Sequence, residues 1–407
     1  MGCPKKLCTH HIIYRLTELD NVMAHNKVYV LGVGELPPTK SLKDLDFREM
    51  TFEAAVRAYA DAGIGPSEVD GLFSAELDFV EGISIADEYT PDQVGTRLKF
   101  NMLVVGDFLE ALFHAYMAVR SGLMDLVAVE SHARPSEMEN YADVLRSSLD
   151  PHCLRPILSD PYAIAGLDAR AFLGKTGSTT RDLSLVAEKN LRNAARSGGP
   201  YGELLTAEDV ERTTFVYEPL RQKHVAQFSD YVAVVVLGSE RAAKGSERAV
   251  EIASIWQAGA TSGAHQWMRK WGVMEWVKGA LERVGRDLRG NPMRSCDLVE
   301  FTEFFAHQEL QFLSALLGSE GEALRMLRAG DLELGSALPF NPSGGCLGNG
   351  NSLNASGGRA FVSAVRQLRG EAGNVQVKGA KTAIVGSLHT EISDSGTLVY
   401  LRTGDAM

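Results

Sequence analysis

Residues 341–370 read NPSGGCLGNGNSLNASGGRAFVSAVRQLRG, and this stretch indicates the fold more clearly than any other. Its first half is glycine-rich, which predicts a strand and loop whose backbone can approach another group closely. In its second half, Phe361, Val365 and Leu368 recur at helical spacing, and Gly370 is placed to end the helix. A glycine loop that leads into a helix N-terminus suits a negatively charged ligand, although a purely structural turn has the same pattern.

Composition limits the classes of function. The chain has 407 residues, of which 45% are hydrophobic and 23% charged, as expected for a globular protein with a large core. Its net charge of -11 disfavours nucleic acid or an anionic membrane as the main ligand. We see neither a secretory signal nor an apolar run long enough for a transmembrane helix, so we expect a cytoplasmic protein.

The cysteines are few and scattered, which argues against a disulfide framework: Cys3, Cys8, Cys153, Cys296 and Cys346. Cys3 and Cys8, with His10 and His11, suggest a metal site, but no second ligand cluster follows them. We therefore predict no metal ligands, and we interpret residues 1–26 as an N-terminal tail.

Strand and helix patterns alternate twice along the chain. Buried-strand patterns begin at Val28 and again at Val250, and each is followed by helices and further strands. This order predicts an α/β fold with mostly parallel sheets covered by helices. We predict an N-terminal half from residues 27–132 and 226–248, and a C-terminal half from residues 249–407. Residues 133–225, rich in Arg, Ser, Asp and Pro with one clear helix near 182–195, are predicted to form an inserted loop domain.

Several segments in this order resemble the thiolase superfamily, and especially its sterol-carrier-protein-type thiolases and thiolase-like acyl-CoA aldolases. They are VYVLGVG from Val28, DAGIGPSEVDGLF from Asp61, ALFHAYMAVRSGLMDLVAVES from Ala111, FSDYVAVVVLGSERA from Phe228, VEFTEFFAHQEL from Val299, and the 341–370 stretch. The resemblance implies two repeated βαβαβ-type halves in a layered α/β/α/β/α core. It also implies a homodimer or larger assembly and a coenzyme A thioester substrate, with coenzyme A present only as part of the substrate and no bound cofactor.

The catalytic positions depart from the superfamily pattern. The acyl-accepting cysteine falls at Val105 or Gly106, and the Gly-His-Pro triplet reads Gly350-Asn351-Ser352. Covalent thiolase chemistry requires a thiolate, which neither Val105 nor Gly106 supplies. We interpret Cys346, placed on the strand that leads into the loop, as a packed core cysteine rather than a displaced nucleophile.

Enolate chemistry does not need that thiolate. The Asn351 amide can donate a hydrogen bond to the thioester oxygen of an enolate, with a structural turn residue as the alternative interpretation. His389 is our first candidate for the base because it falls in a loop that borders the family pocket, and His307 is the second. The superfamily aldolases that this chain resembles have tyrosines at the positions of Thr302 and Asn351, so the chain departs from their pattern at both.

Other residues are assigned supporting roles. Glu303 matches the family's glutamate and is expected to support the site loops, and Tyr231 is expected either to reach the pocket or to fill core volume. The remaining supporting candidates are Thr302, Gly350, Ser352 and Cys346 around the site, and Gly344, Gly345, Arg221, Lys223 and Lys270 for coenzyme A.

The sequence thus favours an enzyme that cleaves a carbon–carbon bond of an acyl-CoA without a covalent intermediate, by retro-aldol chemistry in lipid or aromatic degradation. The alternative is a catalytically silent or partner-dependent thiolase-fold subunit of a thiolase or acyltransferase complex. The expected partners are a second copy of the chain, a zinc-ribbon/OB-fold protein or a paralogous thiolase subunit.

Overall fold

The computed structural model describes residues 26–404, apart from residues 82–84, 148, 150, 153, 157–159, 161 and 260–269. Cys3, Cys8, His10, His11 and Cys153 lie outside the described residues, so the predictions on them are not examined by the structure. Across the described ranges, none of the helices combines the length and the apolar character that crossing a membrane requires.

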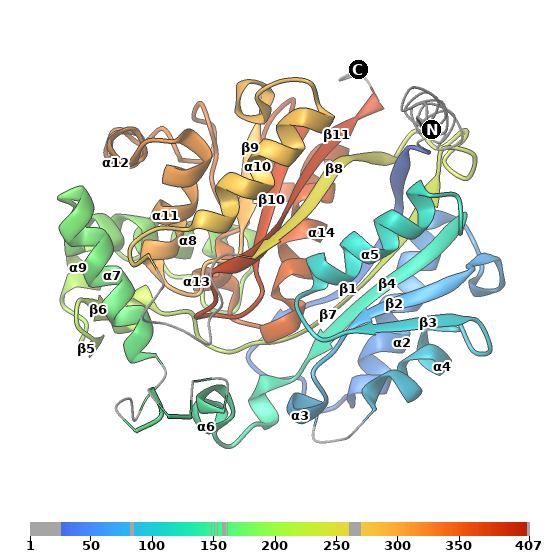
Figure 1. Ribbon diagram of the computed structural model, residues 1–407, viewed down its shortest axis with the longest axis horizontal. Helices are drawn as coiled ribbons and strands as arrows, with labels where there is room; N and C mark the ends of the chain where they lie inside the picture. Colours follow the sequence, from blue (N-terminus) through green and yellow to red (C-terminus); the bar gives the residue numbers. More distant parts are fainter. Residues whose placement is uncertain are drawn as a thin grey trace, which may run out of the picture.

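The N-terminal half builds strands and helices in the predicted order (Figure 1). Its elements are β1 (Val28–Thr39), α2 (Phe47–Ala62), β2 (Gly71–Ala75), α3 (Asp78–Glu81), α4 (Thr90–Val94), β3 (Phe100–Val104), α5 (Phe108–Arg120), β4 (Leu126–Ala133) and β7 (Asp230–Ser239). Asp107 caps α5, since its side chain accepts from the backbone N–H of Leu109 and the Glu110 side chain closes a capping box.

The insertion between β4 and β7 is more helical than predicted. It contains α6 (Tyr141–Arg146), α7 (Ala163–Thr176), α8 (Thr180–Ser197), α9 (Ala207–Glu211), β5 (Phe215–Tyr217) and β6 (Leu220–Arg221). The predicted helix near residues 182–195 is α8. The sequence missed α7 because two glycines interrupt it, and its stability comes from packing of Ile164, Ala169 and Phe172 in the core.

The C-terminal half comprises β8 (Val250–Gly259), α10 (Glu275–Asp287), β9 (Leu298–Phe301), α11 (Ala306–Leu317), α12 (Glu320–Ala329), α13 (Gly345–Asn349), α14 (Ser356–Arg369), β10 (Thr382–Leu388) and β11 (Ser395–Thr403). The strand predicted around Cys346 is wrong, because residues 345–349 form the short helix α13. Its turn is closed by hydrogen bonds from the N–H of Gly348 to the carbonyl of Gly344 and from Gly350 to Cys346. Gly370 ends α14 in the left-handed conformation, as predicted.

The strands form one hydrogen-bonded sheet in the order β3-β2-β4-β7-β1-β8-β11-β10-β9. The prediction of mostly parallel pairing is wrong. Only β2–β3, β2–β4 and β9–β10 are parallel among the described pairs, whereas β7, β1, β8 and β11 pair antiparallel. The reason is connectivity. After the long insertion the chain enters β7 at the end of the sheet where β4 finishes, and β11 returns from β10 through a short loop, so each pair is antiparallel.

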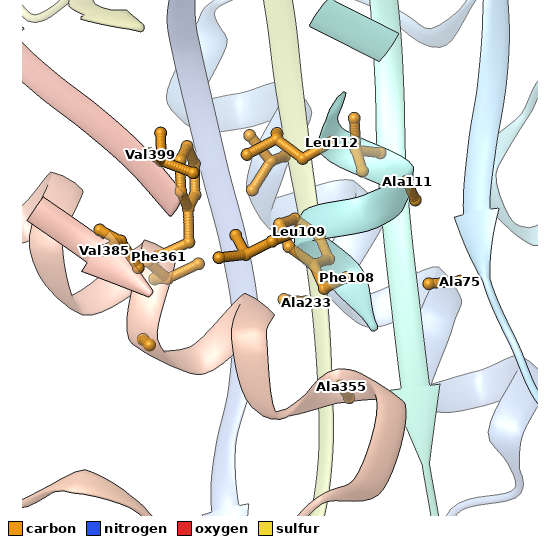
Figure 2. Packing of buried hydrophobic residues seen from close by; sticks show 14 of the residues in the cluster. Ala75, Phe108, Leu109, Ala111, Leu112, Ala233, Ala355, Phe361, Val385 and Val399 are labelled. Atoms are coloured by element: carbon orange, nitrogen blue, oxygen red, sulfur yellow. The ribbon is translucent and has the colours of Figure 1, made fainter. Parts of the chain in front are cut away.

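Helices cover both faces of each half of the sheet, which gives the predicted α/β/α/β/α layers. Helix α2 packs on the outer face of the N-terminal half, and α10 and α11 pack on that of the C-terminal half. Helices α5 and α14 lie between the halves, where Phe108 and Phe361 meet with ring centroids 6.0 Å apart (Figure 2). The start of α5 and the glycine-rich stretch before α14 are thereby brought together at the centre of the molecule.

Candidate active site

Asn351 lies buried in the segment that joins α13 to α14, and its side chain is held at both ends. The amide nitrogen Nδ2 donates to Oε1 of Glu391 at 2.8 Å, and Oδ1 accepts from the backbone N–H of Leu353 at 2.8 Å. Its own backbone N–H donates to the carbonyl of Gln227 at 2.7 Å. These contacts fix the orientation of the amide and engage one of its two N–H groups.

Glu391 is a site residue that the sequence did not reveal. Besides Asn351, it accepts a hydrogen bond from the Tyr141 hydroxyl at 3.0 Å, and Gln308 donates to its backbone carbonyl at 2.8 Å. Burial raises the pKa of the Glu391 carboxyl, and the hydrogen bonds from Asn351 and Tyr141 oppose that rise. Tyr141 and Glu391 are 250 residues apart in the chain, so no local pattern indicated the pair.

His389 lies two residues before Glu391 and contacts the start of α5. Its Nε2 is 3.2 Å from Oε1 of Glu110, and the two side chains are 16% and 10% exposed. Burial lowers the pKa of His389 to about 4, so the imidazole is neutral at physiological pH. Burial raises the pKa of Glu110 to about 7, although a hydrogen bond from the Asp107 N–H lowers it. The environment therefore provides an imidazole base beside a carboxyl group that still holds its proton in mildly acidic solution.

Glu110 also occupies the space where the resemblance places the nucleophilic cysteine. A Cβ added at Gly106 would lie 1.8 Å from Oε2 of Glu110, so a side chain there would displace the carboxylate. Val105, the other aligned position, is 73% exposed. Behind them, the buried Asp107 carboxylate accepts from the N–H of Gly357 at 2.9 Å, and burial raises its pKa to about 7. The bond from Gly357 to Asp107 thus links the start of α14 to the start of α5, next to Glu110.

Thr302 and Ser352 position the backbone around these groups. Thr302 donates through Oγ1 to Ser387 at 3.3 Å and accepts from the N–H of Leu388 at 3.1 Å, which joins the ends of β9 and β10. The hydroxyl of Ser352, which follows Gly350 and Asn351, lies 2.9 Å from that of Ser229. Both hydroxyls are satisfied within the protein, as expected for supporting residues.

Glu303 lies at the centre of a fully buried polar network. Its carboxylate accepts from Asn190 at 2.9 Å, from Asn341 at 2.7 Å and from the N–H of Leu347 at 3.1 Å. Burial, followed by the charge of Glu309, raises its pKa to about 8. Since Leu347 belongs to α13, Glu303 holds the glycine-rich loop in place, which is the contact that its predicted supporting role requires.

His307 lies elsewhere in the fold. It is buried near the start of α11, and its Nε2 is 3.3 Å from Oδ2 of Asp168 on α7. Asp168 also accepts from Gln311 at 2.7 Å and from the N–H of Gly272 at 2.9 Å. His307 therefore faces the α7–α11 contact, whereas Asn351 faces Glu391 and His389 faces Glu110. Of the two predicted bases, only His389 lies in the loop after β10, whose Glu391 contacts Asn351.

Cys346 and Tyr231 are packed core residues. Burial raises the pKa of the Cys346 thiol to about 12, which opposes thiolate formation. The Tyr231 hydroxyl donates to Oε2 of Glu35 at 2.5 Å, and Arg366 pairs with the same carboxylate. Of the two alternatives for Tyr231, its complete burial and the direction of its hydroxyl toward Glu35 on β1 fit the filling of core volume.

The residues predicted to bind coenzyme A make contacts within the protein. A Cβ at Gly344 would lie 2.6 Å from that of Ala194, and one at Gly345 would lie 2.0 Å from Oε1 of Glu303, so close packing within the protein accounts for both glycines. The basic candidates all have protein partners: Arg221 donates to the Thr213 carbonyl at 2.6 Å, Lys223 pairs with Glu203 at 2.7 Å, and Lys270 pairs with Glu275 at 2.5 Å. Phosphate binding by these residues stays a prediction.

Comparisons with known proteins agree with this fold. Residues 289–402 match the family described as thiolase C-terminal domain-like. The 17-hydroxy-3-oxo-4-pregnene-20-carboxyl-CoA lyase of Mycobacterium tuberculosis is 26% identical over 93% of this chain and 100% of its own length. The acetyl-CoA acetyltransferase of Methanothermobacter thermautotrophicus is 27% identical over 91% of this chain and 97% of its own.

A solved structure of the Ltp2-ChsH2(DUF35) aldolase superposes with a TM-score of 0.80 and 22% identity, covering 93% of this chain and 98% of that one. Other related proteins include sterol carrier protein 2 and a steroid side-chain-cleaving aldolase. The resemblance predicted from the sequence is therefore confirmed: the chain is a thiolase-fold protein, similar to the sterol-carrier-protein-type and aldolase branch of the thiolase superfamily, and it lacks the superfamily's usual catalytic cysteine and histidine.

Proposed function

We propose that this protein cleaves a carbon–carbon bond of a β-hydroxyacyl-CoA by a retro-aldol reaction without a covalent intermediate. One observation carries the proposal. The short loop after β10 holds His389 at 3.2 Å from Glu110 and Glu391 at 2.8 Å from Asn351. A base, a proton donor and an oriented amide are thereby arranged around one loop.

The base step belongs to His389. Its neutral imidazole accepts the proton of the substrate's β-hydroxyl, the β-carbon becomes a carbonyl, and the bond between the α- and β-carbons breaks. The electron pair of that bond forms a thioester enolate. The N–H of Asn351 that Glu391 does not engage donates to the enolate oxygen, and a donor of this kind lowers a barrier by about 2.7–4 kcal/mol.

Glu110 completes the reaction. Its protonated carboxyl delivers a proton to the α-carbon of the enolate, which releases the shortened acyl-CoA. Direct transfer from the resulting imidazolium of His389 to the carboxylate of Glu110, across their 3.2 Å contact, then restores both groups. The cycle consumes no proton and needs no external co-reactant.

Partners are the second part of the proposal. The neighbouring structure contains Ltp2 with ChsH2(DUF35), and we propose that this chain also binds a second subunit, of the zinc-ribbon/OB-fold kind expected from the family resemblance. The alternative function, a silent or partner-dependent subunit of a thiolase or acyltransferase complex, shares this requirement but predicts no cleavage by His389 and Glu110.

We also propose a homodimer formed through β3. This strand lies at the edge of the sheet, and its Phe100 and Met102 are 43% and 37% exposed. An edge strand with exposed apolar side chains is a template for pairing with a second chain.

The test is a panel of β-hydroxyacyl-CoAs incubated with the purified chain, with and without a zinc-ribbon/OB-fold partner, and analysed by mass spectrometry. Formation of a shorter acyl-CoA together with a carbonyl compound supports the proposal. Thioester binding without cleavage under either condition refutes it and favours the silent subunit.

A further inference from the structure

Three buried side chains converge on the face of the sheet opposite the active site. Glu130 and His132 alternate along β4 and share the face that packs on α2, and Glu76 follows the adjacent strand β2. Glu76 and Glu130 are 0% exposed and His132 is 1% exposed. One potential ligand atom from each residue lies within 4.8 Å of the other two.

Three of the four carboxylate oxygens in this cluster lack hydrogen-bond partners among the described residues. Within the part of the chain that the structure describes, neither oxygen of Glu76 has a hydrogen-bond partner, and Oε2 of Glu130 also has none. The hydroxyls of Ser74 and Thr90 lie near enough to favour the charged form of Glu76 but make no hydrogen bond of standard geometry with it. A buried carboxylate without a partner is costly, so the arrangement calls for a positive charge.

Neighbouring groups fix the orientation of the cluster. Oε1 of Glu130 lies 2.8 Å from Nδ1 of His132 and accepts from the Thr51 hydroxyl at 3.2 Å. The ring of Phe47 stacks on His132 with centroids 5.2 Å apart. Burial, followed by the charge of Glu130, raises the pKa of Glu76 to about 7, whereas the interaction with His132 lowers it. Supporting hydrogen bonds and an apolar wall of this kind are typical around metal ligands.

We propose that Glu76, Glu130 and His132 bind one divalent transition-metal ion of the Zn²⁺ or Mn²⁺ class. Two carboxylates and one imidazole suit such ions better than Mg²⁺, which prefers oxygen ligands only. The ion neutralises the buried carboxylates and links the ends of β2 and β4. At those ends, Asn354 from the glycine-rich segment donates to the carbonyls of Ala75 at 2.7 Å and His132 at 2.9 Å. The site is therefore structural and supports the segment that carries Asn351. It is independent of the proposed function.

The sequence did not predict this site. Its ligands are the Glu-x-His pair of Glu130 and His132 on one strand and the distant Glu76, and this spacing matches no familiar metal motif. Strand alternation places Glu130 and His132 on one face, but only the pairing of β2 with β4 adds Glu76.

The experiment uses the full chain stripped with a chelator and titrated with Zn²⁺, Mn²⁺ or Mg²⁺ alone, followed by calorimetry and thermal denaturation. We expect one equivalent of Zn²⁺ or Mn²⁺ to bind and to raise the denaturation midpoint, with little effect of Mg²⁺. Glu76→Gln and His132→Gln should abolish this response. The control Glu137→Gln should retain it, because Glu137 is 61% exposed and pairs with Arg134.

The Glu76→Gln and His132→Gln variants also distinguish metal binding at this site from metal binding by Cys3, Cys8, His10 and His11. Undiminished binding and stabilisation in Glu76→Gln would overturn the proposal, as would absence of stoichiometric binding by the wild-type chain. Should a variant not fold, the visible spectrum of the Co²⁺-loaded wild-type chain decides. Carboxylate and imidazole ligation without a thiolate charge-transfer band supports the site, and a thiolate band or no bound Co²⁺ refutes it.

Discussion

Glu303 offers the sharpest test of how the glycine-rich loop is held. Its carboxylate is fully buried and accepts from Asn190, Asn341 and the N–H of Leu347. Burial and Glu309 raise its pKa to about 8, so we expect Glu303 to be protonated at neutral pH. Glutamine, which is neutral and of the same shape, should then replace it far better than alanine.

The magnitudes follow from the individual hydrogen bonds. In Glu303→Ala, the N–H of Leu347 loses its acceptor, and the NH2 groups of Asn190 and Asn341 keep only their bonds to Glu309 at 2.8 and 3.0 Å. With the cavity included, we expect a loss of about 3–5 kcal/mol in the free energy of unfolding. Glu303→Gln keeps a carbonyl for Asn190 and Leu347, but its NH2 replaces the oxygen that accepts from Asn341, so two donors face each other and we expect a loss of about 1–3 kcal/mol.

The pH dependence has a definite sign. The unfolded chain releases the Glu303 proton near its ordinary pKa of 4.5, whereas the folded chain releases it near 8. The wild type therefore loses stability relative to Glu303→Gln as the pH rises from 4.5 to 8, and the difference stays constant at higher pH.

The assay is urea denaturation followed by tryptophan fluorescence, since the chain has four tryptophans. All three proteins are compared at about pH 6 and about pH 9, on either side of the raised pKa. A Gln variant as unstable as the Ala variant at the lower pH would refute a protonated Glu303. So would a difference between wild type and Glu303→Gln that does not change with pH.

Three further predictions concern the site and the assembly. Asn351→Ala should lower kcat about 10²–10³-fold. Asn349→Ala, which removes hydrogen bonds to Ser343 and Gly345 in the same loop, should leave the turnover of the folded protein nearly unchanged, and equal losses would instead indicate loop damage. The profile of kcat/KM against pH should rise near 4, where His389 becomes neutral, and fall near 7, where Glu110 loses its proton. His389→Gln should abolish most activity, and an acid limb at the ordinary histidine pKa would contradict this assignment. Met102→Lys should yield a monomer by light scattering, whereas the control Leu123→Lys, at an exposed position outside β3, should not; a persistent dimer in Met102→Lys would exclude the β3 interface.

Local patterns predicted most of the elements. The helix ended by Gly370 and the helix near residues 182–195 lie where the sequence placed them, because caps and periodicity act within a few residues. Helix α7 was missed because its packing partners are distant in the chain. The strand expected around Cys346 failed because side chains from other segments, Glu303 above all, hold residues 345–349 as a helix.

The sequence by itself determined the family resemblance, the absence of the usual catalytic cysteine and histidine at their aligned positions, and the candidates Asn351 and His389. Residue identity and order along one chain are enough for those conclusions. Only the tertiary structure decided that His389 faces Glu110, that Glu391 and Tyr141 orient Asn351, and that His307 faces Asp168 instead. These contacts join residues far apart in the chain, and burial then shifts their pKa values. Neither the distance between two side chains nor their exposure to water is encoded locally, so both depend on how the sheet and its layers pack.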